Sequence, residues 1–421
     1  MRDAGNSRGG RARPLVWYMA AGYGLPAGIE AHILHYATAM RNHGFDTRVV
    51  VFKELPPDRH RFLQALDERG IAIVSLQAEG ARRERCRIRA LRPVWAVYTA
   101  VVKRRRPDMT SFSLWARGQA GIRELVRRLA EDQPDLIHVF GRLRTDAWDK
   151  LPPERTIHHE MMTGTVDRHW TEEELADYRA YAERVARHFA PGTGVAENVH
   201  REFGIRREIV PIFTMCPDEA GAPKSGISDF KSQIALRFGV ICRLTEQKGI
   251  SYLLEALRQY RDRHGDVDFT FAGVGPMESD ILAFAKRHGL ARVRVMRVGS
   301  PVEVLGGVDV FVHPSVDDAM PMSIAEALMC GVPCIVCRVG GCADLVRDGR
   351  EGFVIEPRRT DMILERMEGF ADMAPEEFAA FRRRARQRYE QVCRPASVGA
   401  VVASHYRDVL RAAGEGRGGR A

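Results

Sequence analysis

Residues 308–345 read VDVFVHPSVDDAMPMSIAEALMCGVPCIVCRVGGCADL, and this stretch narrows the fold more than any other. Its opening apolar, β-branched run predicts a buried parallel strand that ends at Pro314. Pro321 suits the first position of a helix, and residues 323–329 continue that helix. The N-terminus of the helix then points back to the carboxyl end of the strand, which is the edge where open α/β sheets bind ligands.

Two carboxylates, Asp318 and Glu326, flank the predicted start of this helix. The first backbone N–H groups of a helix have no partner within the helix. Together with the positive end of the helix dipole, they form a seat for an anion such as a phosphate. The stretch therefore predicts a phosphate site bracketed by two acids.

The size and composition of the chain predict an ordinary globular protein with two domains. At 421 residues the chain exceeds the size at which a single hydrophobic core usually keeps growing. No apolar run approaches the roughly 20 residues that span a bilayer, and residues 1–14 lack the apolar core of a signal peptide. We therefore expect a cytoplasmic protein.

Eight cysteines without a secretory signal predict reduced thiols rather than a disulfide framework. Four of them, Cys330, Cys334, Cys337 and Cys342, lie close together and raise the question of a zinc site. Cys334 and Cys337 are three positions apart on a predicted strand, so their side chains point to opposite faces. The pattern favours buried thiols, and we predict no metal site.

The formal charge of +9 is concentrated in one segment, Arg82 to Arg106, which holds ten basic residues and one acid. Apolar residues, among them Trp95 and Tyr98, are interleaved with these cations. Such a segment suits the surface of an anionic membrane. It equally suits a surface helix whose apolar stripe packs on its own domain. No nucleic-acid-binding motif accompanies the charge, and we expect no nucleic-acid partner.

Strands and helices alternate along the chain, which predicts βαβ units and parallel sheets. The pattern loosens at residues 210–228, which makes this stretch the best candidate for a linker between two such series. The predicted strands before the linker are 15–20, 47–52, 72–75, 136–140 and 156–158, and those after it are 235–241, 268–272, 293–298, 308–313, 334–337 and 353–355.

Two strand-to-helix turns carry residues suited to anions. The turn AAGYGLPAGIEAH includes Gly28, where a glycine lets the backbone approach a phosphate. Its glycine spacing does not fit a dinucleotide fingerprint, so we expect no nicotinamide site. In the second series, FGVICRLTEQKGI places Arg243 and Lys248 after a strand, where two cations can hold a diphosphate. Because Asp318 and Glu326 follow another strand of the same sheet, all four residues are expected at one edge.

Taken together, these residues resemble glycosyltransferase family 4, whose members are retaining, nucleotide-sugar-dependent enzymes of the GT-B fold. The resemblance covers most of the second series and the ends of the first. It is carried by AGIEAH, RLTEQKG, FTFAGVGP, VDVFVHPS, the two acids with seven residues between them, ALMCGVP, GGCADLV and DGREGFVIEP.

The resemblance implies a role for each matching residue. Arg243 and Lys248 would bind the diphosphate of the donor and stabilise it as it leaves, and Asp318 would contact the transferred sugar. His158 or His159 would take the place of the active-site histidine of the family. The donor would otherwise be bound by Glu326 through the ribose hydroxyls, by the helix start at Pro321, Met322 and Ser323, by the Gly28 turn and by Gly275.

The resemblance also implies an α/β fold with two Rossmann-like domains that face each other across a deep cleft, and a C-terminal helix that crosses back to the first domain. The activity would be transfer of a sugar to an acceptor hydroxyl with retention, in cell-surface polysaccharide or glycolipid synthesis, with neither cofactor nor metal. The implied divisions are a disordered basic segment 1–13, an acceptor domain 14–213, a linker 214–230, a donor domain 231–385, returning helices 386–411 and a disordered tail 412–421.

Several positions depart from the family pattern. Asp318 stands where a glutamate is usual, Cys242 replaces a glycine before the arginine, and Arg297 stands where a glycine usually ends a strand. These departures leave two alternatives open. One is a GT-B protein that has lost transferase activity and serves as a binding or assembly subunit, and the other is a nucleotide-sugar epimerase or hydrolase.

Overall fold

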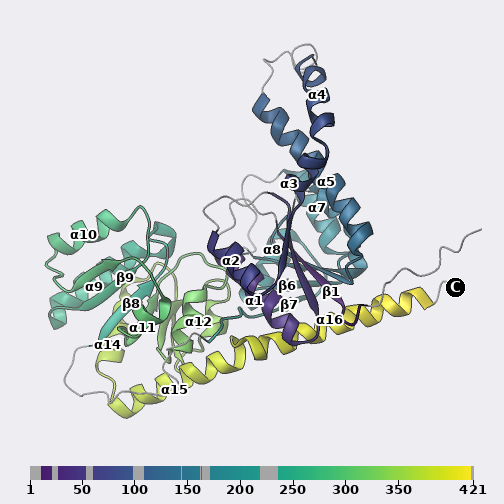
Figure 1. Cartoon of the computed structure of the whole chain (residues 1–421). Helices are drawn as coiled ribbons and strands as arrows, with labels where there is room; N and C mark the ends of the chain where they lie inside the picture. The colour runs from purple at the N-terminus through teal and green to yellow at the C-terminus, as the bar shows by residue number, and fades with distance from the viewer. Residues whose placement is uncertain are drawn as a thin grey trace, which may run out of the picture.

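The computed structural model describes residues 11–20, 27–53, 60–97, 109–143, 145–161, 163, 171–218 and 236–418. These residues form two α/β domains, each built on a parallel sheet, and a long C-terminal helix runs along the first domain (Figure 1). The predicted architecture of two Rossmann-like domains is confirmed.

The first sheet has seven parallel strands in the order β3-β2-β1-β4-β5-β6-β7. Its interior strand β1 is buried on both faces, because Tyr18 packs in one hydrophobic cluster and Trp17 and Met19 pack in another. Two-sided burial explains why such strands read as continuous apolar runs. The strands are β1 Leu15–Ala20, β2 Asp46–Val51, β3 Ala72–Ser75, β4 Leu136–Phe140, β5 Thr156–His159, β6 Arg187–Ala190 and β7 Ile209–Pro211, and the helices around them are α1 Ala27–Asn42, α2 His60–Glu68, α6 Thr145–Trp148, α7 Glu172–Ala182 and α8 Thr193–Phe203.

The second sheet has six parallel strands in the order β10-β9-β8-β11-β12-β13. Cys334 and Cys337 belong to clusters on different faces of this sheet, as their spacing predicted. The strands are β8 Arg237–Ile241, β9 Asp268–Ala272, β10 Val293–Met296, β11 Val310–His313, β12 Cys334–Cys337 and β13 Gly352–Ile355, and the helices are η4 Glu246–Lys248, α9 Ile250–His264, α10 Glu278–Arg287, α11 Pro301–Leu305, α12 Met322–Met329, α13 Cys342–Leu345 and α14 Thr360–Ala371.

Two C-terminal helices join the domains. Helix α15 (Pro375–Val392) packs on the second domain, and α16 (Pro395–Gly418) returns to the first (Figure 1). Val402 and Tyr406 of α16 are fully buried in the core of the first domain. The hydroxyl of Tyr406 donates to the hydroxyl of Tyr18 at 3.2 Å. The expected return of the C-terminal helix to the first domain is therefore confirmed.

The structure differs from the predicted divisions at several points. Strands β6 and β7 were not predicted, and α15 runs without a break across the expected boundary at residue 385. Helix α16 continues to Gly418, beyond the expected boundary at 411, so residues 412–418 are helical. Residues 214–218 of the predicted linker pack against α15, since the Tyr389 hydroxyl donates to the Cys216 carbonyl at 2.8 Å. Residues 1–10 and 219–230 lie outside the described part of the chain.

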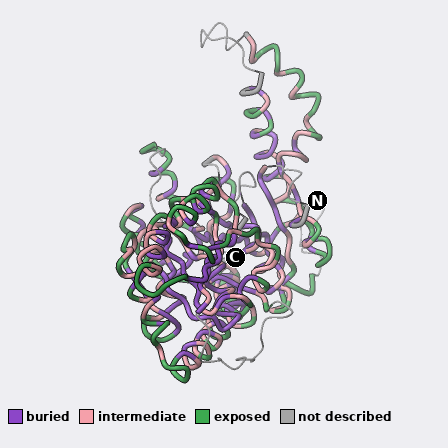
Figure 2. Tube along the Cα trace, turned by 90° about the vertical axis from the view of Figure 1, so that its left-hand side faces the viewer, coloured by how far each residue is buried: buried purple, intermediate pink, exposed green. Residues whose placement is uncertain are grey.

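The basic segment forms part of a helical hairpin that stands away from the body of the first domain (Figures 1 and 2). It consists of α3 (Leu76–Arg83), α4 (Arg85–Val97) and α5 (Met109–Asp132), and residues 98–108 lie outside the described part. Val94 on α4 is 62% exposed, so packing on its own domain does not account for the whole apolar content of the segment. Among the described helices, none has the length and apolarity needed to cross a bilayer.

Candidate functional site

Three side chains meet at the carboxyl edge of the second sheet. The carboxylate of Asp318 accepts a hydrogen bond from Nε2 of His313 at 2.9 Å and forms an ion pair with Nζ of Lys248. Lys248 lies in η4 after β8, and His313 is the last residue of β11, so two adjacent strands deliver them to one point. The side chains of Lys248, Asp318 and His313 are only 12%, 14% and 2% exposed. The sequence prediction brought Lys248 and Asp318 together correctly but missed His313.

The electrostatics of Asp318 keep it ionised. Burial by itself raises the pKa of its carboxyl, but His313 and Lys248 together outweigh this effect. The net result is a pKa below the ordinary aspartate value. At neutral pH the cluster therefore holds a carboxylate that compensates the charge of Lys248.

Arg243 lies on the turn after β8 and is exposed. Within the described part of the chain, its guanidinium makes no ion pair or hydrogen bond. Gly275, on the neighbouring loop, packs closely against this turn. A Cβ at this position would lie only 2.3 Å from the carbonyl oxygen of Leu244, so no larger residue fits. The amide of Leu244 donates to the Val274 carbonyl at 2.9 Å, which ties the two loops together. Gly275 thus has a structural reason to be glycine, and Arg243 is available to an anion.

Helix α12 begins beside this cluster. Pro321 takes the N-cap position rather than the expected first helical position, since its ψ of 128° is extended, and Met322 is the first helical residue. Ser323 is buried and Glu326 is half-buried in the same helix. The sulfur of Met322 accepts a hydrogen bond from the hydroxyl of Thr214 at 2.8 Å. The segment between the domains therefore touches the start of α12.

The two domains also meet at a second contact. The amide and hydroxyl of Thr193, at the start of α8, donate to the Asp344 carboxylate at 2.6 and 2.5 Å. A Cβ at Gly194 would lie 2.3 Å from the carbonyl oxygen of Gly340, and a Cβ at Gly340 would lie 2.0 Å from that of Asp318. Glycines are therefore required where α8, the Gly-Gly turn and the Asp318 loop pass one another. Asp344 caps α8 from the other domain, a role that the sequence analysis missed.

His158 and His159 lie at the end of β5, and both are fully enclosed. Nδ1 of His159 is 3.2 Å from Nε2 of His138, and Nδ1 of His158 is 3.1 Å from Nε2 of His188. Nε2 of His158 also lies 3.1 Å from the Gly141 carbonyl oxygen. The two rings are 0% and 2% exposed, so both have the surroundings of hydrogen-bonded core histidines.

Burial keeps these histidines neutral. It lowers the pKa of His158 to about 4, although Glu160 and the Gly141 carbonyl partly offset the effect. The pKa of His159 and that of His138 are also held well below the ordinary value, mainly by burial and then by neighbouring histidines. The first domain thus contains an uncharged histidine core. Gly28 lies in the first turn of α1, and the preceding residues 21–26 lie outside the described part.

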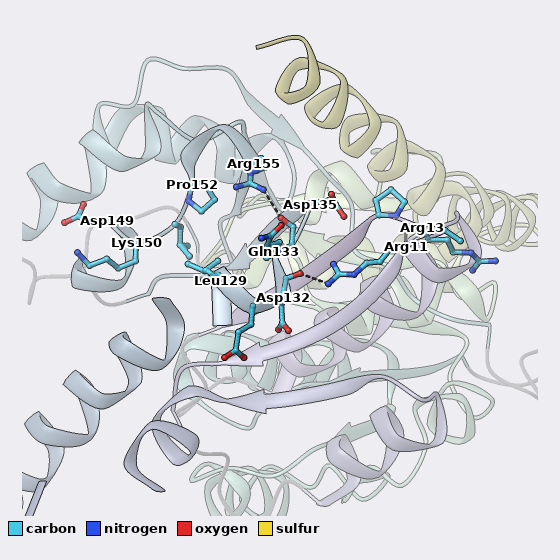
Figure 3. Close-up of a pocket in the computed structure, with 16 residues that line it drawn as sticks. Arg11, Arg13, Leu129, Asp132, Gln133, Asp135, Asp149, Lys150, Pro152 and Arg155 are labelled. Atoms are coloured by element: carbon cyan, nitrogen blue, oxygen red, sulfur yellow. Dashed lines mark hydrogen bonds between the residues drawn. The ribbon is translucent and has the colours of Figure 1, made fainter. Parts of the chain in front are cut away.

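A large hollow of about 1060 Å³ lies elsewhere, at the amino ends of the first sheet (Figure 3). Pro14 precedes β1 and Asp135 precedes β4, so the hollow is at the amino edge of the first sheet, whereas the Asp318 cluster is at the carboxyl edge of the second. Two of its arginines are engaged by backbone carbonyls, as Arg155 donates to the Pro134 carbonyl at 3.2 Å and Arg11 donates to the Asp132 carbonyl at 2.6 Å, and the hollow gathers none of the predicted site residues. We therefore take the edge with Lys248 and Asp318 as the candidate site.

Sequence comparison supports this choice of site. Residues 235–372 match the model of the family described as "Glycosyl transferases group 1". The matched segment contains Arg243, Lys248, Asp318 and Glu326. The residues predicted for the donor site in the second domain therefore fall in the part of the chain that carries the family signal.

Curated relatives match over part of the chain. The putative colanic acid biosynthesis glycosyltransferase WcaL of Escherichia coli (strain K12) is 27% identical over 160 residues, which is 36% of this chain and 39% of the relative. The 2-deoxystreptamine glucosyltransferase of Streptomyces kanamyceticus is 28% identical over 200 residues, 45% of this chain and 49% of the relative. The chain thus covers less than half the length of either relative.

Solved structures match over nearly the whole chain. The structure of Anabaena Alr3699/HepE in complex with UDP has a TM-score of 0.67 and covers 94% of this chain and 100% of its own, at 17% identity. A glycosyltransferase structure from Rickettsia africae has a TM-score of 0.71 with 95% and 99% coverage, at 12% identity. At such identities the likeness concerns the fold, and the fold of the chain is GT-B.

Proposed function

We propose that the chain is a glycosyltransferase that moves a sugar from a nucleoside-diphosphate sugar to an acceptor hydroxyl. The observation that carries the proposal is the convergence of Lys248, His313 and Asp318, beside the exposed Arg243, inside the segment matched to the glycosyltransferase family. In the reaction, the acceptor oxygen bonds to the anomeric carbon and the bond from that carbon to the diphosphate breaks. The hydroxyl proton passes to the departing diphosphate, and the products are the glycoside and the nucleoside diphosphate.

Positive charge near the leaving group lowers the barrier of such a reaction, because negative charge develops on the diphosphate. Arg243 offers a forked guanidinium that is free to bind a phosphate, and Lys248 offers a point charge. The donor diphosphate would share Lys248 with Asp318. We propose that these two cations, with the N–H groups of Met322 and Ser323, supply the charge stabilisation that a metal ion supplies in other enzymes.

Retention of configuration is part of the proposal, with attack from the face that the diphosphate leaves. Oδ2 of Asp318 already accepts from His313 and pairs with Lys248, which makes this carboxylate a poor nucleophile. Asp318 is better suited to contact the hydroxyls of the transferred sugar, and Glu326 to hold the ribose. His158 and His159 act, in this proposal, by packing the sheet behind the acceptor side.

The setting of the reaction is a further part of the proposal. One relative is named for colanic acid biosynthesis, and synthesis of a cell-surface polysaccharide or glycolipid at the cytoplasmic face of a membrane is consistent with that likeness. The basic segment Arg82 to Arg106 would contact the anionic membrane surface.

The proposal is tested by a thermal-shift screen against UDP-, GDP- and ADP-sugars, followed by measurement of nucleoside diphosphate release. HepE was solved with UDP, so UDP-sugars come first. We expect one nucleotide class to stabilise the protein and release to depend on an added acceptor, supplied as a lipid extract or a simple glycoside. Release in water alone would instead indicate a hydrolase, and binding with no release under any condition would indicate a binding subunit.

A further inference from the structure

The charges of the α3–α4–α5 hairpin divide into two groups. On one side, each acid is engaged by arginines. Arg128 pairs with Glu79 at 2.6 Å, Arg123 donates to Glu84 at 2.6 Å, and Glu124 accepts from Arg127 at 3.0 Å. The first two contacts hold α5 against α3 and its C-cap residue, the third lies within α5, and together they leave that side of the hairpin close to neutral.

The other side holds cations without compensation. Arg82 lies in the last turn of α3, Arg85, Arg89 and Arg92 follow along α4, and all four are exposed. Within the part of the chain that the structure describes, none of the four makes an ion pair or a hydrogen bond. The spacing of four and three residues places Arg85, Arg89 and Arg92 on one face of α4, where like charges destabilise each other.

These arginines line a groove of about 610 Å³ between α4 and α5. From α5, Arg117 and the hydroxyl-bearing Ser113 line the opposite wall. No acidic side chain is among the described residues that line it. The four arginines Arg82, Arg85, Arg89 and Arg92 match the multiple oxygen acceptors of a phosphate, because each guanidinium can donate two parallel hydrogen bonds.

The two helices that form this groove also carry exposed apolar side chains. Val94 follows Arg92 on α4, and Leu114 and Trp115 follow Ser113 on α5, with exposed fractions of 62%, 67% and 42%. Trp115 is held in place by stacking on Trp95, with ring centroids 5.3 Å apart. A free phosphate would use the groove alone, whereas a lipid would use both the groove and these apolar side chains.

We propose that the groove between α4 and α5 is a binding site for the phosphate group of an anionic membrane lipid, whose chains contact Val94, Leu114 and Trp115. The site is separate from the donor site, because α3 follows β3 at one end of the first sheet while the domain contact at Thr193 follows β6 near the other. The inference deepens the membrane contact proposed above by naming a site within it. It predicts specific binding rather than a diffuse attraction to charge.

The test is sedimentation of the full chain with vesicles of phosphatidylglycerol and phosphatidylcholine, compared with vesicles of phosphatidylcholine alone. The variant Arg85→Ser/Arg89→Ser/Arg92→Ser should lose on the order of a hundredfold in affinity for the anionic vesicles. The matched control is Lys286→Ser/Arg287→Ser/Arg350→Ser, which removes the same charge from exposed positions of the second domain and should bind like the unchanged protein. Equal losses of vesicle affinity in both variants would overturn the proposed site, because they would show that binding depends only on the total positive charge of the protein.

A second arm separates a lipid from a free phosphate. Leu114→Ser, at a residue 67% exposed, should weaken binding to anionic vesicles severalfold. It should leave unchanged the calorimetric binding of inorganic pyrophosphate that Arg85→Ser/Arg89→Ser/Arg92→Ser abolishes, a difference that excludes pyrophosphate held by Arg243 and Lys248. Pyrophosphate binding without any vesicle binding would overturn the lipid as occupant. Thermal midpoints of all variants are measured alongside, and release of nucleoside diphosphate with a simple glycoside acceptor should stay at the level of the unchanged protein. A loss of that release alone would count against the proposed function and not against the lipid site.

Discussion

In each domain an interior strand ends with a histidine, β5 with His159 and β11 with His313, yet the two strand ends differ in charge. In the second domain, His313 bonds to Asp318, which also pairs with Lys248. In the first domain, His158 and His159 bond to other histidines and to a backbone carbonyl. One strand end therefore holds a charged cluster beside an exposed arginine, and the other is a neutral, closed core.

The comparison shows that burial alone does not decide the protonation of a group. Burial dominates at His158, whose pKa falls to about 4. At Asp318, ionic partners outweigh burial and the pKa falls below its ordinary value, so the charged form persists. A histidine at a strand end thus belongs to a charged site where neighbouring loops supply charged partners, and to a neutral core where they supply none.

Breaking the charged cluster should have the largest effect. Lys248→Ala removes one of the cations proposed to face the leaving diphosphate, and the rate of nucleoside diphosphate release should fall roughly a hundredfold to a thousandfold. It also leaves the carboxylate of Asp318 without its ion pair, so the free energy of unfolding should fall as well.

The double variant Lys248→Ala/Asp318→Ala separates the two effects. Because it removes both charges, it should recover much of the stability measured by urea unfolding, yet release should remain low. Recovery of the rate together with stability would contradict the assignment of Lys248 to the reaction.

Acid should destabilise the neutral histidine core of the first domain, because protonation would place charges on buried rings. The pKa of His158 is about 4, mainly because of burial. Burial also lowers the pKa of two histidines of α1, His35 to about 4 and His32 to about 3. Between pH 6.5 and 4 the unfolded chain binds protons at these histidines and the folded chain does not, so the free energy of unfolding should fall as the pH falls. At pH 5 each such group should cost about 2 kcal/mol.

Urea unfolding at pH 7 and pH 5 checks this expectation. His158→Gln should reduce the difference between the two pH values by a comparable amount, since it removes one titrating group. A stability that is the same at pH 7 and pH 5 would contradict the neutral-core assignment.

The contact between the two domains should have a smaller effect. Asp344→Ala removes the cap of α8, which costs about 1 kcal/mol at a typical N-cap. Because Asp344 and Thr193 lie on different domains, the loss should favour separated domains and raise the KM for the donor severalfold. Glu197→Ala, on the exposed face of α8, is the charge-matched control and should leave the KM unchanged. An unchanged KM in Asp344→Ala would show that the contact between Thr193 and Asp344 does not affect donor binding.

Much of the fold could be predicted from the sequence, because buried parallel strands read as apolar runs. The bounds of β1, β3, β4, β9 and β12 were predicted residue for residue. Strands β6 and β7 could not be predicted in this way. They are only four and three residues long, with a histidine in one and a proline in the other, and their place is defined by pairing with neighbours.

The candidate site was predicted in part. The motifs placed Arg243, Lys248 and Asp318 at one sheet edge, since the carboxyl ends of parallel strands share an edge. His313 was missed although it directly precedes Pro314 at a predicted strand end, which was a usable signal. The pairing of Asp344 with Thr193 gave no local signal, because the two residues are 151 positions apart and meet only when the domains pack. The role of Glu326 remains a prediction, and for His158 and His159 the proposal replaces the expected active-site role by a packing role because both side chains are buried.

Arg243 offers the most direct test of the central claim that the Asp318 edge binds and stabilises the leaving diphosphate. Its guanidinium is exposed and has no ion pair in the described part of the chain, so Arg243→Gln should fold with an unchanged thermal midpoint. The measurement is acceptor-dependent release of nucleoside diphosphate by this variant and the unchanged protein, with the donor that the thermal-shift screen identifies. We predict a loss on the order of a hundredfold or more. Release at the unchanged rate would contradict the account.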